Sequence, residues 1–73
     1  MNRAAEEQLR QIAAKSPHPG VHSGDLINKP VARWLVAEGY AQNSGGSPSS
    51  LAYVTITESG QAMLDMFAMG RTP

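Results

Sequence analysis

Two cations four residues apart, Lys29 and Arg33, are the side chains of this sequence best placed to bind another molecule. They belong to residues 28–40, where apolar positions recur at helical spacing and predict an amphipathic helix. Side chains four apart share one side of a helix, so both cations are expected to face solvent together and to meet a polyanion there. An ordinary solvated helix surface would contain the same pair, and both interpretations stay open at this stage.

The predicted helix has a start signal and a stop signal. Asn28 and Pro30 mark its beginning, because proline is tolerated in the first helical turn, where its missing N–H would have no partner. Gly39 marks its end, because glycine enters the left-handed backbone region without a steric penalty. The apolar side expected to pack inward consists of Val31, Leu35 and, obliquely, Trp34.

Other residues with chemical potential form no recognisable catalytic or metal-binding set. His18 and His22 have an H-x3-H spacing, but a Pro-Gly turn separates them and Asp25 is the only nearby acid. Zinc requires three or four well-placed ligands, so these are expected to be ordinary loop histidines. The chain has no cysteine, and its serines lie in loops without a suitably placed histidine. We therefore expect no enzyme activity, no metal and no cofactor.

Length and composition predict one folded domain over residues 1–73. A chain of 73 residues supports one small core, and its hydrophobic content of 41% is too high for a disordered chain. The first 15 residues contain scattered charges and no continuous apolar run, so they predict neither a signal peptide nor a membrane span. A soluble, cytoplasmic protein is the expectation.

The formal charges cancel overall but are unevenly distributed. Six Lys and Arg balance six Asp and Glu, which argues against a strongly basic nucleic-acid-binding protein. Between Gln8 and Ala37, however, four cations stand against a single acid, whereas the rest of the chain is acidic. Such polarity can present one positive side to a phosphate backbone, although imbalances of this size also arise by chance.

Elements on both sides of the central helix complete an α+β, mainly helical fold. Residues 3–15 predict a first helix, and Val21 predicts a strand of one or two residues. Ser23 can cap a short helix in which Leu26 and Ile27 touch the core. Two helices joined so tightly have the local shape of a helix-turn-helix.

The second half of the chain predicts a hairpin and a closing helix. Residues 51–56 alternate as a strand, with a partner strand expected around residues 39–43. Thr57 can cap the last helix, whose expected buried stripe consists of Gly60, Met63, Leu64 and Phe67. The expected architecture is a three-helix core covered on one side by a two-stranded hairpin, with the central helix touched by all other elements.

Two local signatures resemble the winged helix-turn-helix family of DNA-binding domains. Residues 32–40, ARWLVAEGY, are similar to the family's recognition-helix ending, with Leu35 four residues before Gly39 and an apolar residue entering the wing. Residues 53–64, YVTITESGQAML, are similar to a returning wing strand followed by Thr-x-x-Gly and a closing helix. The resemblance implies a three-helix core, a two-stranded β-hairpin wing and a C-terminal helix. It also implies a small bacterial or bacteriophage-type protein that binds double-stranded DNA as a transcriptional regulator or an architectural accessory.

The same resemblance implies which residues would contact DNA. Asn28, Lys29 and Arg33 would face the major groove, where arginine binds guanine O6 and N7 with two donors and lysine more often neutralises phosphate. Ser23 would contribute a backbone contact to phosphate at the start of the short helix. The wing tip, residues 43–50, would approach the sugar-phosphate backbone or the minor groove.

The alternative is a protein-protein interaction module on the same scaffold, such as a phage-encoded inhibitor or assembly factor. Net neutrality and a wing tip without Lys or Arg favour it, since phosphate neutralisation supplies much of the affinity for DNA. Met66 and Met69 are expected toward the surface of the last helix, where methionines suit contact with a partner helix or a second copy. A frayed final turn would expose them equally.

Overall fold

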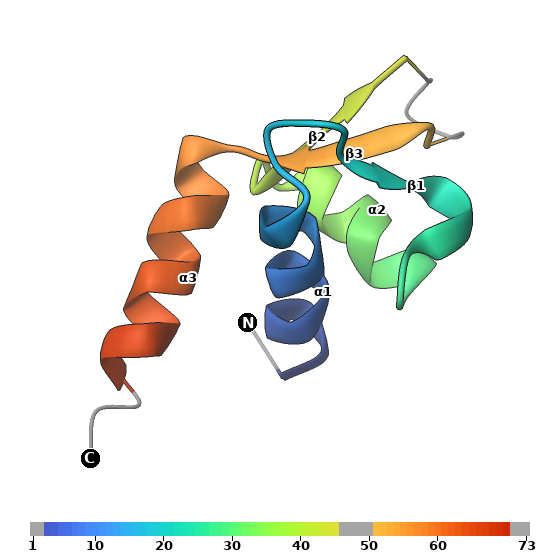
Figure 1. Cartoon of the computed structure of the whole chain (residues 1–73). Coiled ribbons are helices and arrows are strands. Elements are labelled where there is room, and N and C mark those ends of the chain that lie inside the picture. Colours follow the sequence, from blue (N-terminus) through green and yellow to red (C-terminus); the bar gives the residue numbers. More distant parts are fainter. Residues whose placement is uncertain (1–2, 46–50, 71–73) are drawn as a thin grey trace.

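Three α-helices and a three-stranded antiparallel sheet make up the described part of the chain (Figure 1). The computed structural model describes residues 3–45 and 51–70. In chain order the elements are α1 (Arg3–Ala14), β1 (Val21–His22), the 3-10 turn η1 (Ser23–Asp25), α2 (Lys29–Ala37), β2 (Ala41–Ser44), β3 (Tyr53–Ile56) and α3 (Glu58–Gly70). The α+β class is confirmed. Within the described residues, no helix is both long and apolar enough to cross a membrane.

The sheet has the strand order β1-β3-β2. Val21 pairs with Val54 and His22 with Tyr53 on one side of β3, while Asn43 and Ser44 of β2 pair with Val54 and Tyr53 on the other. The short strand predicted at Val21 is therefore confirmed, and the predicted two-stranded hairpin is extended to three strands. The helices lie on one side of this sheet (Figure 1).

The core forms where α1, α2 and the sheet meet. Its fully or nearly fully buried apolar side chains include Leu9, Ile12, Val21, Ala32, Leu35 and Val54. Burying one leucine or isoleucine side chain contributes about 1.5–3 kcal/mol. α1 packs against α2, α3 and β3, whereas α2 packs against α1 and β2. α1 rather than α2 is therefore the helix that packs extensively against both other helices, because its apolar stripe reaches them.

α2 begins and ends as its sequence predicts. The Asn28 side chain Oδ1 accepts a hydrogen bond from the Val31 N–H at 3.2 Å, and Pro30 occupies the first turn. At the other end Gly39 has φ +84°, and the Tyr40 N–H donates to the Leu35 carbonyl at 2.9 Å. This backbone arrangement is a Schellman motif, which satisfies carbonyl groups that the helix itself leaves unpaired.

The short helix predicted to start at Ser23 is only a three-residue 3-10 turn, and its cap is His22. The His22 Nδ1 accepts a hydrogen bond from the Gly24 N–H at 3.1 Å. The Ser23 N–H donates to the Ala52 carbonyl at 2.8 Å, which keeps Ser23 against the sheet. Leu26 is already extended and ends the turn. The backbone that follows is bonded to side chains of α1 at Asp25, Ile27 and Asn28, so the turn does not continue as a helix.

Thr57 joins the end of α2 to the start of α3. Its hydroxyl donates to the Gly39 carbonyl at 2.6 Å and accepts from the Gly60 N–H at 3.2 Å. The predicted cap is confirmed. A Cβ on Gly60 would collide with the Tyr40 carbonyl oxygen and would lie 2.8 Å from Ile56 Cγ1. The Thr-x-x-Gly spacing therefore serves a close approach between α3 and the backbone that follows α2.

The expected buried stripe of α3 is only partly realised. Gly60 is buried, but Met63, Leu64 and Phe67 are each half-buried. α3 contacts α1 and β3, and its far end extends beyond the rest of the domain (Figure 1). The sequence pattern correctly predicted a helix there, but not how little of it the core covers.

Gly60→Ala is expected to lower the free energy of unfolding by about 1–3 kcal/mol, because the new methyl group must displace the Tyr40 backbone. Urea or thermal denaturation measures the difference. Ser59→Ala, a change at the neighbouring exposed position, should stay within about 0.5 kcal/mol. Equal stability of the two variants would contradict the close approach.

Candidate functional site

The exposed side of α2, which we call the α2 front, contains both predicted cations. The helix turns Ala32 and Leu35 into the core, and Val31 and Val36 are half-buried. The α2 front consists of the exposed residues Lys29, Pro30, Arg33, Trp34 and Ala37. At 100° per residue Pro30 and Ala37 lie at its centre, with the two cations on one flank and Trp34 on the other. The surface is therefore mixed rather than purely cationic.

Lys29 and Arg33 make no ion pair with any described residue. Two cations of α1 are instead paired locally, because Arg3 lies 3.4 Å from Glu7 and Arg10 lies 2.8 Å from Glu6. The Arg10 pair reduces the positive excess that the sequence shows between Gln8 and Ala37, since Glu6 lies just outside that range. What remains is a smaller positive excess, with two of its cations on α2.

Asn28 and Ser23 are less available than Lys29 and Arg33. The Asn28 side chain is half-buried and its oxygen caps α2. The Ser23 N–H is bonded to Ala52, and the neighbouring Gly24 N–H is bonded to His22. The predicted backbone route from this turn to phosphate thus has its donors already engaged, and the half-buried Ser23 hydroxyl is the remaining candidate group.

Two large apolar side chains beside the cations are exposed. Ile27 is 65% exposed and Trp34 is 43% exposed, while Leu26 is buried. The expectation that Leu26 and Ile27 both touch the core is wrong, because consecutive residues of an extended segment point to opposite sides. The Trp34 and Tyr40 rings lie 6.0 Å apart between centroids at an interplanar angle of 45°. No sequence signal marked Ile27 as a surface residue.

The predicted protein interface on α3 is described only in part. Met66 is 64% exposed, in agreement with the expectation that it lies at the surface. The Met69 side chain and wing-tip residues 46–50 lie outside the described residues.

A hydrogen-bond network between α1 and the chain before α2 orients the α2 front. Gln8 Nε2 donates to Gln11 Oε1 at 2.7 Å, and Gln8 Oε1 accepts from the Asn28 N–H at 2.6 Å. Gln11 Nε2 donates to the Asp25 carbonyl at 2.6 Å, and Gln11 Oε1 accepts from the Ile27 N–H at 3.1 Å. Two side-chain amides therefore bind three backbone positions over residues 25–28. Sequence reasoning missed both glutamines, because their long-range partners leave no periodic signal.

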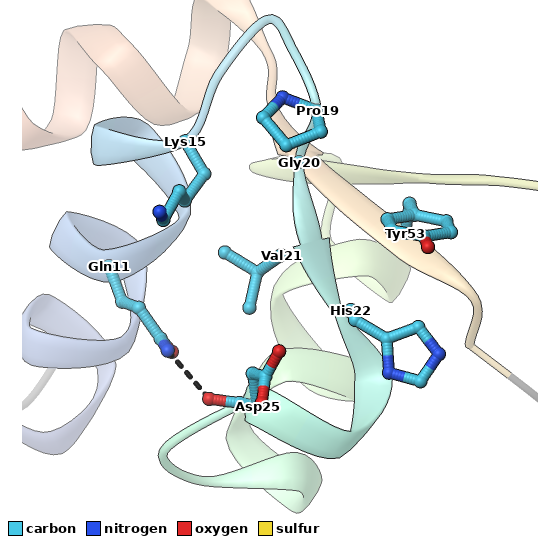
Figure 2. A pocket seen from close by; sticks show the side chains of 8 residues that line it. All are labelled: Gln11, Lys15, Pro19, Gly20, Val21, His22, Asp25 and Tyr53. Atoms are coloured by element: carbon cyan, nitrogen blue, oxygen red, sulfur yellow. Dashed lines mark hydrogen bonds between the residues drawn. The ribbon is translucent and has the colours of Figure 1, made fainter.

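A pocket of about 570 Å³ lies along β1, and no residue of the α2 front lines it. In Figure 2, Gly20, Val21 and His22 run between α1 and Tyr53, with Asp25 at the lower end. The complete lining is Gln11, Lys15, Pro19, Gly20, Val21, His22, Asp25 and Tyr53. The His22 and Tyr53 rings make an edge contact with centroids 5.2 Å apart. We call this the β1 pocket.

No protein-family model, curated protein or solved structure matches this chain. Among the described residues, no three His, Asp or Glu side chains are grouped so that they could hold a metal ion. The functional assignment therefore rests on the residues and geometry described above.

Gln8→Leu is expected to destabilise the domain by about 1–3 kcal/mol, because a buried side chain of similar size would leave the Asn28 N–H without its acceptor. Denaturation measures the loss, and amide hydrogen exchange should accelerate most at Ile27 and Asn28. Gln61→Leu is the matched control, since Gln61 is exposed and, among the described residues, its side chain bonds to Asp65 alone. Equal exchange at residues 27 and 28 in both variants would contradict the network's role.

Proposed function

We propose that this chain is a winged helix-turn-helix-type domain that binds double-stranded DNA through the α2 front and acts as a small regulator or architectural accessory. The observation that carries the proposal is the exposure of Lys29 and Arg33 on one flank of α2 without an acidic partner among the described residues. Both side chains are exposed, so both are available to a polyanion.

The order of elements also supports the proposal. A helix, a short strand, a tight turn, a helix, a hairpin and a closing helix follow one another, which is the order that the family resemblance implies except that a three-residue turn replaces the second helix. The tight turn is shorter than the second helix of the family. The hydrogen bonds of Gln8 and Gln11 hold the start of α2 in place of that helix. α2 is thus held as a rigid element, which is what a helix that enters a groove requires.

Four of the five residues of the α2 front then have a contact to make with DNA. Arg33 lies in the middle of α2 and has the planar donor set that binds guanine O6 and N7. Lys29, in the first turn, suits a phosphate oxygen. Ala37 and Pro30 are small enough to allow close approach and can contact a thymine methyl group. Arg33 is accordingly the residue expected to discriminate between base pairs.

The DNA proposal is tested by fluorescence anisotropy with a mixed-sequence duplex over a series of salt concentrations. Lys29, which suits a phosphate oxygen, should contribute about 0.9 to the magnitude of the slope of log K against log salt, whereas a base contact by Arg33 contributes little to that slope. We therefore expect Lys29→Ala to weaken binding and flatten the salt dependence, and Arg33→Ala to weaken binding with a smaller change of slope.

Arg3→Ala is the control for that titration, because it removes the same charge from α1, where Arg3 is paired with Glu7. It should leave affinity and slope unchanged. An absence of binding by the unaltered chain at the lowest salt concentration would remove DNA as a partner.

A protein-protein interaction module is the second candidate, and the exposure of Ile27 and Trp34 favours it. Trp and Arg are enriched among residues that dominate protein interfaces, and Trp34 and Arg33 are adjacent on the α2 front. Exposed Met66 on α3 offers a further adaptable contact for a protein partner or a second copy.

Under this alternative, Trp34→Ala should weaken partner binding by about 2 kcal/mol or more, since an aromatic anchor at an interface centre has that effect. Affinity capture from a bacterial lysate, compared between Trp34→Ala and Lys29→Ala, measures it. A protein retained equally by both variants would not be bound through Trp34.

A further inference from the structure

The side chain of Trp34, the single tryptophan of the chain, is at the surface of a rigid helix. It is 43% exposed, although the next residue, Leu35, is fully buried. The Trp34 and Tyr40 rings contact one another at a centroid distance of 6.0 Å. Tyr40 is itself half-buried and packs against the core. A supported aromatic neighbour therefore holds Trp34 in place while part of its side chain stays open to a ligand.

The cations of the α2 front lie one step around the helix from this ring. Arg33 and Trp34 are 100° apart, with the small residues Pro30 and Ala37 between them. On a helix whose diameter with side chains is about 10–12 Å, this angle separates the two side chains by roughly 8 Å. A ligand that joins an anion to a flat ring through a short spacer fits such a pair. A nucleotide has this composition, since one sugar joins its phosphate to its base.

Charge gives this surface a direction. Lys29 and Arg33 make no ion pair with a described residue and lie on one side of Trp34. The exposed acid Glu38 follows Trp34 by four residues and lies on its other side. Lys29 is also at the N-terminal end of α2, where the helix dipole favours an anion. Phosphates are therefore attracted to the Lys29 and Arg33 flank and repelled beyond Trp34.

We propose that the α2 front also binds single-stranded nucleic acid, with one unpaired base stacked on Trp34 and the adjoining phosphates on Arg33 and Lys29. In a duplex the neighbouring base pairs already cover the faces of each internal base, so an aromatic side chain stacks most readily on an unpaired one. Stacking supplies affinity that two cations alone do not. The proposal shares Lys29 and Arg33 with the duplex proposal but does not require duplex binding.

The fluorescence of Trp34 is the first readout, because the chain has no other tryptophan. Oligodeoxythymidine of about eight nucleotides, within the usual length of single-strand sites, should quench it saturably. An abasic deoxyribose-phosphate oligomer of equal length keeps the charges but has no bases, and it should bind more weakly and quench little. Equal binding of the abasic oligomer would overturn stacking. Oligouridine is the RNA arm, and a preference between it and oligodeoxythymidine identifies the sugar.

Variants at Trp34 test the same contact by anisotropy of labelled oligodeoxythymidine. Trp34→Leu keeps an apolar side chain but no aromatic face, so it should weaken binding by about five- to 150-fold, the range for one stacked base. Trp34→Phe should recover most of this loss. Tyr53→Leu is the control, because Tyr53 is an equally exposed aromatic residue on β3. Unchanged affinity in Trp34→Leu, or an equal loss in Tyr53→Leu, would overturn the site.

Charge variants and a duplex complete the test. Lys29→Ala and Arg33→Ala should each reduce the magnitude of the salt slope by about 0.7, the value for one phosphate of a single strand. Glu38→Gln should tighten binding by about two- to fivefold, since it removes an exposed like charge. A duplex of equal length separates the two proposals. Duplex binding without quenching by the single strand would overturn this one alone, and quenching without duplex binding would overturn only the duplex proposal.

Discussion

The hydrogen bonds from Gln8 and Gln11 to the backbone of residues 25–28 are the constraint on which the rest of this structure depends. A three-residue turn buries too little apolar surface to orient the helix that follows it. The amides solve this by pairing directly with backbone groups, each bond contributing about 0.5–1.5 kcal/mol net. Because Gln8 is fully buried, an unpaired partner would cost more than its bond contributes. The position of α2 is therefore specified by polar groups as well as by packing.

Hydrogen bonds fix both ends of α2. The side chains of the α2 front make none of these bonds. At the N-terminal end, the Asn28 N–H is held by Gln8 while the Asn28 side chain caps the helix. At the C-terminal end, Gly39 permits the reversal of the chain and its carbonyl accepts from Thr57, which starts α3. Ala32 and Leu35 fill the core behind. The α2 front is left exposed on a rigid helix, which suits recognition of another molecule whether that molecule is DNA or protein.

The parts of this fold that follow from local chemistry could be predicted from the sequence, and those that depend on distant partners could not. Pro30 and Gly39 bounded α2 correctly because proline and glycine act through their own backbone. The shortness of the turn after His22 was missed because the bonds that hold residues 25–28 come from Gln8 and Gln11, which are distant in sequence. The exposure of Lys29 and Arg33 on one side of α2 could be predicted from helical spacing. The exposure of Ile27, the bond between Gln8 and Gln11, and the β1 pocket arise only from tertiary structure.

Charge on the α2 front limits what kind of DNA binding is physically reasonable. Proteins that bind DNA mainly through phosphate neutralise about 6–10 phosphates, whereas Lys29 and Arg33 can neutralise about two. Arg10 adds little because Glu6 is paired with it. Counterion release alone would then give weak binding, so a useful affinity must come from base contacts by Arg33, apolar contacts around Pro30, or a second copy that doubles the contact area. The α2 front is mixed, with exposed Trp34 beside the two cations. This composition favours binding through direct apolar and hydrogen-bond contacts over binding through phosphate neutralisation alone.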